Sequence, residues 1–163
     1  MHRTVVFLSS TLGALFVLWL GSQLPDPVAS HFGLSGAPDS HLPRSTFVVF
    51  YALLCGALPT LVWWLQDRAA ARGKANIPNA SYWFSPANAT ATRQFISKHA
   101  AWFSAILGAF LCFIFWLVFQ ANSSASGPTL MQMNKFYFGL LVFLLATALW
   151  LYILHSHFGR KDA

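Results

Sequence analysis

The stretch that decides the fold is His99–Gln120, which reads HAAWFSAILGAFLCFIFWLVFQ. It contains no Asp, Glu, Lys or Arg. A helix needs about 20 apolar residues to cross a hydrocarbon core of about 30 Å, so this stretch is long enough to span a membrane. A barrel strand is a poor alternative, because the stretch lacks apolar/polar alternation and is far longer than such a strand.

Three further apolar runs have the same character. They are Thr4–Leu24, Thr46–Leu65 and Phe136–His157, and none has a charged residue in its interior. The first run follows a short basic lead-in but no cleavage site closes it, so we expect a retained helix. The sequence therefore predicts an all-α integral membrane protein of one domain, residues 1–163, with transmembrane helices at 4–24, 46–65, 99–120 and 136–157.

The composition agrees with burial in lipid. Of the 163 residues, 56% are apolar and only 9% are charged, whereas soluble domains carry about 25% charged residues. The net charge of +6 comes from Lys and Arg at the ends of apolar runs, which is the pattern of membrane topology. We expect the lipid bilayer as a partner and no nucleic acid, since there is no recognition motif and no basic soluble face.

Positive charge also predicts the orientation. One side of the membrane receives Arg3, Arg68, Arg72, Lys74, Arg93, Lys98, Arg160 and Lys161, and the other receives Arg44 and Lys135. Since Lys and Arg favour the cytoplasmic side, both termini and the loop 66–98 are predicted to be cytoplasmic. The loops 23–45 and 121–135 are then predicted to face outward.

The outer loop 23–45 is dense in residues that restrict or direct the backbone. Pro25, Pro27 and Pro38 fix φ, while Gly33 and Gly36 permit turns with positive φ. A flexible connector does not need these residues together. We therefore expect a short structured hairpin or lid on the outer face.

The same loop resembles a known family. Its pattern L-P-x-x-V-x-x-H-F-x-x-x-G-x-P-D is similar to the signature of the DUF1648 domain, which occurs in bacterial membrane proteins that include the SdpI-like immunity proteins. The matching positions are Leu24, Pro25, Val28, His31, Phe32, Gly36, Pro38 and Asp39. In the middle loop, Asn76-Ile77-Pro78-Asn79 followed by Tyr82-Trp83 resembles a second stretch of those proteins.

This resemblance implies a multi-pass protein of the bacterial inner (plasma) membrane that acts by interaction. It implies an outer-face loop for toxin immunity or ligand sensing, with recognition by His31, Phe32, Gly36, Pro38 and Asp39. The middle loop is expected either to rest on the membrane or to dock a cytoplasmic protein partner, and the docking residues would be Asn79, Tyr82 and Trp83. The alternative function is an accessory or structural subunit of a larger membrane complex.

Small residues suggest how the helices pack. Ser104, Gly108 and Cys112 share one face of the third helix, and Ala101, Ala105 and Ala109 share a neighbouring face. Such faces let helix backbones approach closely in lipid. We expect them to pack the protein's own bundle, and a homodimer is the alternative.

The chemistry of the outer loop leaves two interpretations open. His31, Asp39 and His41 are ligand types that suit zinc or copper. Alternatively, these residues are structural: Asp39 caps the turn into the second helix, and His31 forms a hydrogen bond with the loop backbone. Asp26 is then expected to be a solvated turn residue. Without a nucleophile–base pair, paired carboxylates or a phosphate-binding loop, we expect neither an enzyme nor a cofactor.

Two local features complete the expectation. Pro59 is expected to kink the second helix, because it lacks the N–H that the helix needs. The segment 87–98 is expected to form a short amphipathic helix that lies on the membrane surface.

Overall fold

The computed structural model describes residues 2–159 and consists almost entirely of helices. Four are long, and a very short helix and a two-stranded hairpin connect them. The elements are α1 (His2–Gly21), β1 (Val28–Phe32), β2 (Pro38–Leu42), α2 (Arg44–Ala71), α3 (Ala80–Trp83), α4 (Ala89–Asn122) and α5 (Met133–Gly159).

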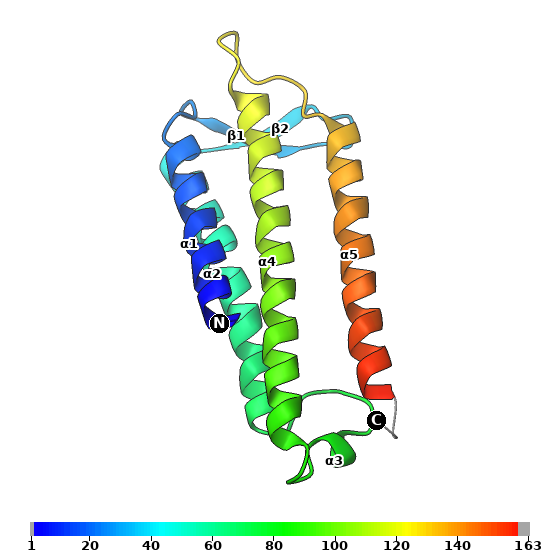
Figure 1. Cartoon of the computed structure of the whole chain (residues 1–163). Helices are drawn as coiled ribbons and strands as arrows, with labels where there is room; N and C mark the ends of the chain where they lie inside the picture. Colours follow the sequence, from blue (N-terminus) through cyan, green and yellow to red (C-terminus); the bar gives the residue numbers. More distant parts are fainter. Residues whose placement is uncertain (1, 160–163) are drawn as a thin grey trace.

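The four long helices run side by side, and short elements close the two ends of the bundle (Figure 1). The hairpin of β1 and β2 lies across one end, which we call the hairpin end. The helix α3 lies at the opposite end, near the last turn of α5. In the part of the chain described, these four helices are long and apolar enough to cross a membrane. The protein is therefore a multi-pass membrane protein in contact with the lipid bilayer.

The centre of the molecule is a bundle of α1, α2 and α4. Pro59 has no N–H, so the carbonyl of Cys55 lacks its usual helical partner. This carbonyl faces Gly13 of α1. A Cβ added at Gly13 would lie 3.1 Å from the carbonyl oxygen of Cys55. On the other side of α2, the hydroxyl of Ser104 donates to the carbonyl of Pro59 over 2.5 Å. Small residues thus bring three backbones together around one proline, and α2 continues as a helix through it.

The fourth long helix, α5, stands apart from this three-helix core and packs against α4. Along its described length, Phe158 is the one buried residue. Phe143 of α5 stacks on Phe110 of α4 with ring centroids 4.3 Å apart. Large apolar side chains on its other faces are exposed, for example Phe138 at 68% and Tyr152 at 69%, which is suitable for a surface in lipid.

The expected fold class is confirmed, and the structure corrects one connecting element. Residues 89–98 do not form a separate surface helix, because they are the first turns of α4, which runs without a break from Ala89 to Asn122. No Gly or Pro interrupts the sequence between Ala89 and His99, so nothing stops the helix there. Similarly, α1 ends at Gly21 rather than at Leu24, which belongs to the start of the hairpin region.

The close approach at Gly13 generates a stability prediction. Gly13→Leu places side-chain atoms against the Cys55 carbonyl and the Cys112 sulfur, so we expect a loss of about 1–3 kcal/mol and a lower melting temperature in detergent. Thr11→Leu is the matched control, because Thr11 is exposed on the same helix. Equal melting temperatures for the two variants would contradict the close packing of α1 on α2 and α4.

Candidate functional site

The sequence predicted that the outer loop carries the functional residues, and this loop forms a short hairpin of two antiparallel strands. Val28 pairs with Leu42 at its base and Phe32 with Pro38 near its tip, with irregular register between them. The tip closes through the amide of Gly36, which donates to the carbonyl of Gly33 over 2.8 Å. Gly36 has a φ of +82°, a conformation that side-chain-bearing residues rarely adopt.

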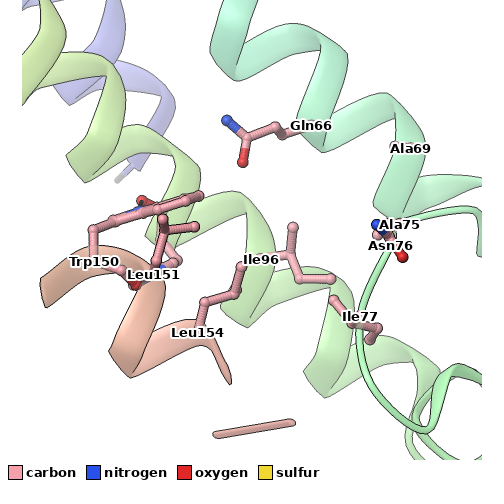
Figure 2. A pocket seen from close by; sticks show the side chains of 10 residues that line it. Gln66, Ala69, Ala75, Asn76, Ile77, Ile96, Trp150, Leu151 and Leu154 are labelled. Atoms are coloured by element: carbon pink, nitrogen blue, oxygen red, sulfur yellow. Dashed lines mark hydrogen bonds between the residues drawn. The ribbon is translucent and has the colours of Figure 1, made fainter. Parts of the chain in front are cut away.

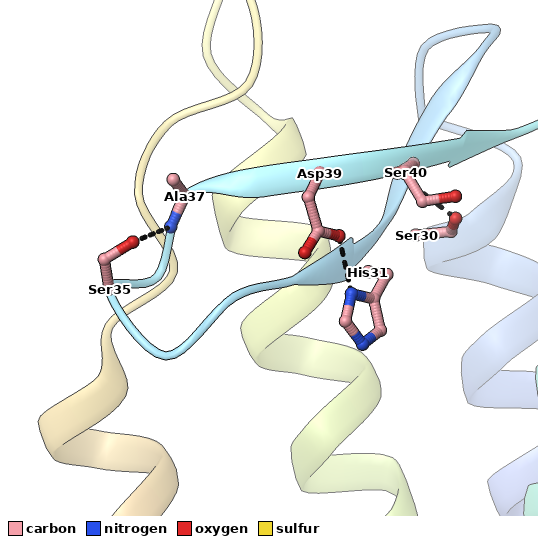
Figure 3. A network of polar contacts seen from close by, with 6 residues as sticks. All are labelled: Ser30, His31, Ser35, Ala37, Asp39 and Ser40. Carbon is pink, nitrogen blue, oxygen red and sulfur yellow. Dashed lines mark hydrogen bonds and ion pairs between the residues drawn. The ribbon is translucent and has the colours of Figure 1, made fainter.

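The two polar residues of the resemblance contact each other. The Nδ1 of His31 on β1 donates to the Oδ1 of Asp39 on β2 over 2.5 Å. Figure 3 shows the ring and the carboxylate facing each other across the two strands. Their side chains are 71% and 52% exposed, so the pair is presented to the surroundings. In water such an exposed pair adds little to stability.

The alternative roles given to these residues from the sequence are corrected. Asp39 does not cap α2 and His31 does not bond loop backbone, because each is engaged with the other. At the start of α2, the carboxylate of Asp26 accepts a hydrogen bond from the backbone N–H of Arg44 over 3.1 Å. The Arg44 guanidinium in turn donates to the carbonyl of Leu24 over 3.1 Å. Asp26 and Arg44 therefore fix the base of the hairpin.

The metal interpretation needs His41 beside this pair. His41 lies opposite Ala29 in the ladder, beyond the irregularity that separates Ala29 from His31. Within residues 2–159, no group of three His, Cys, Asp or Glu side chains is arranged to hold a metal ion. The structure thus brings His31 and Asp39 together and leaves His41 outside the pair.

The residue that holds the hairpin against the bundle is Asn122, at the end of α4. Its Oδ1 accepts from the amide of Ala29 over 2.8 Å, and its Nδ2 donates to the carbonyl of the same residue over 3.0 Å. The Nδ2 also donates to the carbonyl of Val118 over 2.9 Å. Asn122 is 3% exposed and Ala29 fully buried, so this contact is shielded from water. Sequence reasoning missed this role; the one signal was a carboxamide two residues after the apolar run 99–120.

The remaining residues of the resemblance build the hairpin and its contacts. Phe32 packs against the apolar cluster at the hairpin end of the bundle, and Pro38 opposes it in the ladder. The carbonyl of Gly36 accepts from the amide of Met131, in the segment that leads into α5, over 2.8 Å. A Cβ on Gly36 would lie 2.5 Å from the carbonyl oxygen of Met131. Gly36 is therefore required both by its φ and by this close approach.

At the opposite end, two of the three expected docking residues are used inside the chain. Asn79 Nδ2 and Trp83 Nε1 both donate to the carbonyl of Phe158, over 3.2 Å and 3.0 Å. They thereby satisfy a carbonyl in the last turn of α5, which has no partner within the helix. Tyr82 is 40% exposed, and of the three it has the side chain most open to an outside partner.

A cavity of about 290 Å³ lies beside this region, between α2, the segment 75–77, α4 and α5. Gln66 extends into it from α2, facing Trp150 of α5 (Figure 2). Its wall is fixed by a reciprocal contact: His99 Nε2 donates to the Trp150 carbonyl and Trp150 Nε1 donates to the His99 carbonyl, each over 2.9 Å. This contact ties α5 to α4 near the end of the bundle.

One comparison with known proteins finds a family match, and the matched residues include the hairpin. Residues 10–55 match the family model of DUF1648, a domain of unknown function. The match runs from α1 through the hairpin into α2, and the chain therefore contains this domain. No curated protein and no solved structure matches the chain.

The contact at Asn122 generates the second prediction. Asn122→Ala leaves the buried N–H and carbonyl of Ala29 without partners, so we expect a loss of about 2 kcal/mol and faster hydrogen exchange at the Ala29 amide. Asn134→Ala is the control, because Asn134 is an exposed asparagine in the first turn of α5, after the segment that connects α4 to α5. Unchanged exchange at Ala29 in the Asn122 variant would mean that the hairpin is held by other contacts.

Proposed function

We propose that this chain is an interaction protein of the bacterial inner membrane whose hairpin recognises a protein or peptide outside the cell. The observation that carries the proposal is a rigidly mounted but exposed tip. Leu34 at the turn is 88% exposed, and the side chains of His31 and Asp39 beside it are also exposed. The base of the hairpin is held by buried Asn122. An apolar contact flanked by a polar pair is a suitable arrangement for binding a protein surface.

The distribution of charge supports an outward-facing hairpin. Arg44 and Lys135 lie at the hairpin end, and six Lys and Arg lie at the opposite end: Arg3, Arg68, Arg72, Lys74, Arg93 and Lys98. Arg160 and Lys161, which also enter the count from the sequence, lie outside the described residues. By the positive-inside rule the hairpin end faces outward, and both termini are cytoplasmic.

The likeness of the hairpin to the SdpI-like immunity proteins narrows the proposal. In this form the ligand is a toxin that attacks the membrane from outside, and the hairpin binds it or senses it. Ligand sensing without a toxin uses the same surface. Both forms place the role in binding at the tip, and neither requires catalysis or a cofactor.

The second candidate function is an accessory subunit of a larger membrane complex. One observation favours it: α5 is exposed along most of its length, with one buried residue among those described. A homodimer through exposed helix faces belongs to the same proposal. The residues Ser104 and Gly108 do not serve such an interface, because they contact Pro59 inside the bundle.

Alanine variants of the polar pair test the recognition role. A photo-crosslinking residue replaces Leu34 in the full chain in native membranes, and the adduct is quantified in the wild type and in His31→Ala and Asp39→Ala. We expect either variant to reduce the adduct by about tenfold, because each removes a charge-assisted contact at the binding surface. The melting temperature is expected to stay the same, since the pair is exposed.

His41→Ala is the matched control, because His41 is an exposed histidine of the same hairpin outside the pair. It is expected to leave the adduct unchanged. Equal adduct in all variants would reject recognition by the pair. If adducts form from residue 138 or 152 of α5 and not from residue 34, the accessory-subunit function is the correct one.

Reporter fusions test the orientation. Fusions after Gly36 and Ser124 should read as periplasmic, and fusions after Asn79 and Ala163 as cytoplasmic, because of the charge difference between the two ends. A cytoplasmic signal from the fusion at Gly36 would place the hairpin inside the cell and reject an extracellular ligand.

A further inference from the structure

A groove made of two hollows runs between α1 and α4, and Pro59 of α2 also lines its second part. Its first part, about 270 Å³, lies near the start of α1 and is lined by His2, Val5, Lys98, Ala101 and Trp102. Its second part, about 320 Å³, includes Ser9 and Ala105. These two residues lie one helical turn beyond Val5 and Ala101 on the same faces, so the second part follows the first along the two helices.

The groove has a solid floor and high apolar walls. Gly13 is buried in the floor, and Ala101 is only 2% exposed. Leu12 and Trp102 form walls and are 57% and 58% exposed. Small residues on the floor and large ones on the rim leave a channel that is open to the lipid.

The serine hydroxyls in the groove have hydrogen-bond partners within the protein. The hydroxyl of Ser9 donates to the carbonyl of Val6 over 3.0 Å. The hydroxyl of Ser10 accepts from Thr60 over 2.9 Å. Because each hydroxyl has a partner within the protein, an apolar chain can lie over them at a reduced desolvation cost.

The mouth of the groove carries positive charge. Lys98 is exposed and forms no salt bridge with any described residue. His2 lies beside it in the lining. Arg3, by contrast, is already occupied by Asp67, 3.9 Å away, and by the ring of Trp63. Lys98 is thus the cation at this mouth that is available to an anionic ligand.

The groove is longer than one leaflet of a bilayer is deep. Lys98 and Cys112 mark its two ends on α4. At 1.5 Å per residue the fourteen-residue separation spans about 21 Å. A hydrocarbon core of about 30 Å gives about 15 Å for each leaflet, so the groove has room for a headgroup at its mouth and one acyl chain beyond it.

We propose that this groove binds one anionic phospholipid of the leaflet next to the chain's N-terminal end. The phosphate lies at Lys98, with Trp102 at the level of the headgroups, and one acyl chain lies along Ala101, Ala105 and Gly13. Basic pockets between transmembrane helices bind anionic headgroups in this way, and Trp is enriched at the boundary of the membrane.

Charge argues against a second copy of the chain in the groove. The chain has only four acidic residues, and among residues 2–159 they are Asp26, Asp39 and Asp67. Asp26 and Asp39 are at the hairpin end, and Asp67 is paired with Arg3. Among the described residues, a parallel copy therefore brings no free carboxylate to Lys98, whereas a phospholipid brings a phosphate.

Native mass spectrometry of the full-length protein tests the site. The protein in detergent is titrated with phosphatidylglycerol and, separately, with phosphatidylcholine. We expect one molecule of phosphatidylglycerol to bind before others, and Lys98→Gln to weaken this first binding about fivefold, which is the effect of one Lys at an anionic surface. Arg93→Gln is the matched control and should bind as the wild type does, because Arg93 lies outside the lining on the same helix.

The acyl chain is tested separately by filling the groove. Ala105→Leu should weaken the first binding while circular dichroism and the melting temperature stay as in the wild type. If this variant is unstable, Ala109→Leu, at an exposed position further along the groove, takes its place. Inorganic phosphate at millimolar concentration should not displace the lipid, since it has no acyl chain.

Several results would overturn the proposal. If Lys98→Gln binds phosphatidylglycerol as the wild type does, Lys98 is not the headgroup site. If Arg93→Gln loses as much affinity as Lys98→Gln, the binding comes from general attraction between charges. Displacement by inorganic phosphate would make the ligand a free anion. Dimers in the same spectra that dissociate in Ala105→Leu, with lipid binding unchanged, would assign the groove to a second copy.

Discussion

The carboxamide of Asn122 is the contact on which the hairpin end of this protein depends. A backbone N–H and a carbonyl at Ala29 are buried there, and both need partners. An amide side chain is the group that supplies a donor and an acceptor together, and Asn122 does so from the last turn of α4. Because β1 is fixed in this way, β2 and the tip have a defined position. The tip then reaches the segment before α5 through Gly36 and Met131.

Most of the fold was predictable from hydropathy, because in lipid only elements with internally paired backbones are stable. Four uncharged runs of sufficient length therefore leave few alternatives to a helical bundle. The boundaries were less predictable. The segment 89–98 is amphipathic enough to lie on a membrane, yet it continues α4, since helix propensity alone does not tell where a helix leaves the lipid. The exposed side of α5 was also not predictable, because Leu and Phe are as compatible with lipid as with a neighbouring helix.

The candidate site was predictable in its residues and not in their partners. The density of Pro and Gly predicted a structured turn, and Gly36 indeed adopts a positive φ. The pairing of His31 with Asp39 follows from a register that contains irregularities, and irregular register cannot be derived from the turn residues. The role of Asn122 depends on a contact between residues 93 positions apart. No local pattern contains that contact.

The outer loop and the segment 76–83 hold the two ends of one helix. At the hairpin end, Gly36 accepts from Met131 just before α5; at the other end, Asn79 and Trp83 donate to Phe158 in its last turn. Gly36 and Asn79 both have positive φ, +82° and +53°, as turns at such close contacts require. Fixing a helix that packs mainly against α4 thus accounts for Gly36, Asn79 and Trp83. It does not account for the pair of His31 and Asp39, whose side chains contact each other and are 71% and 52% exposed. In the proposed recognition role, this exposed pair is the part of the hairpin that meets a partner outside the chain.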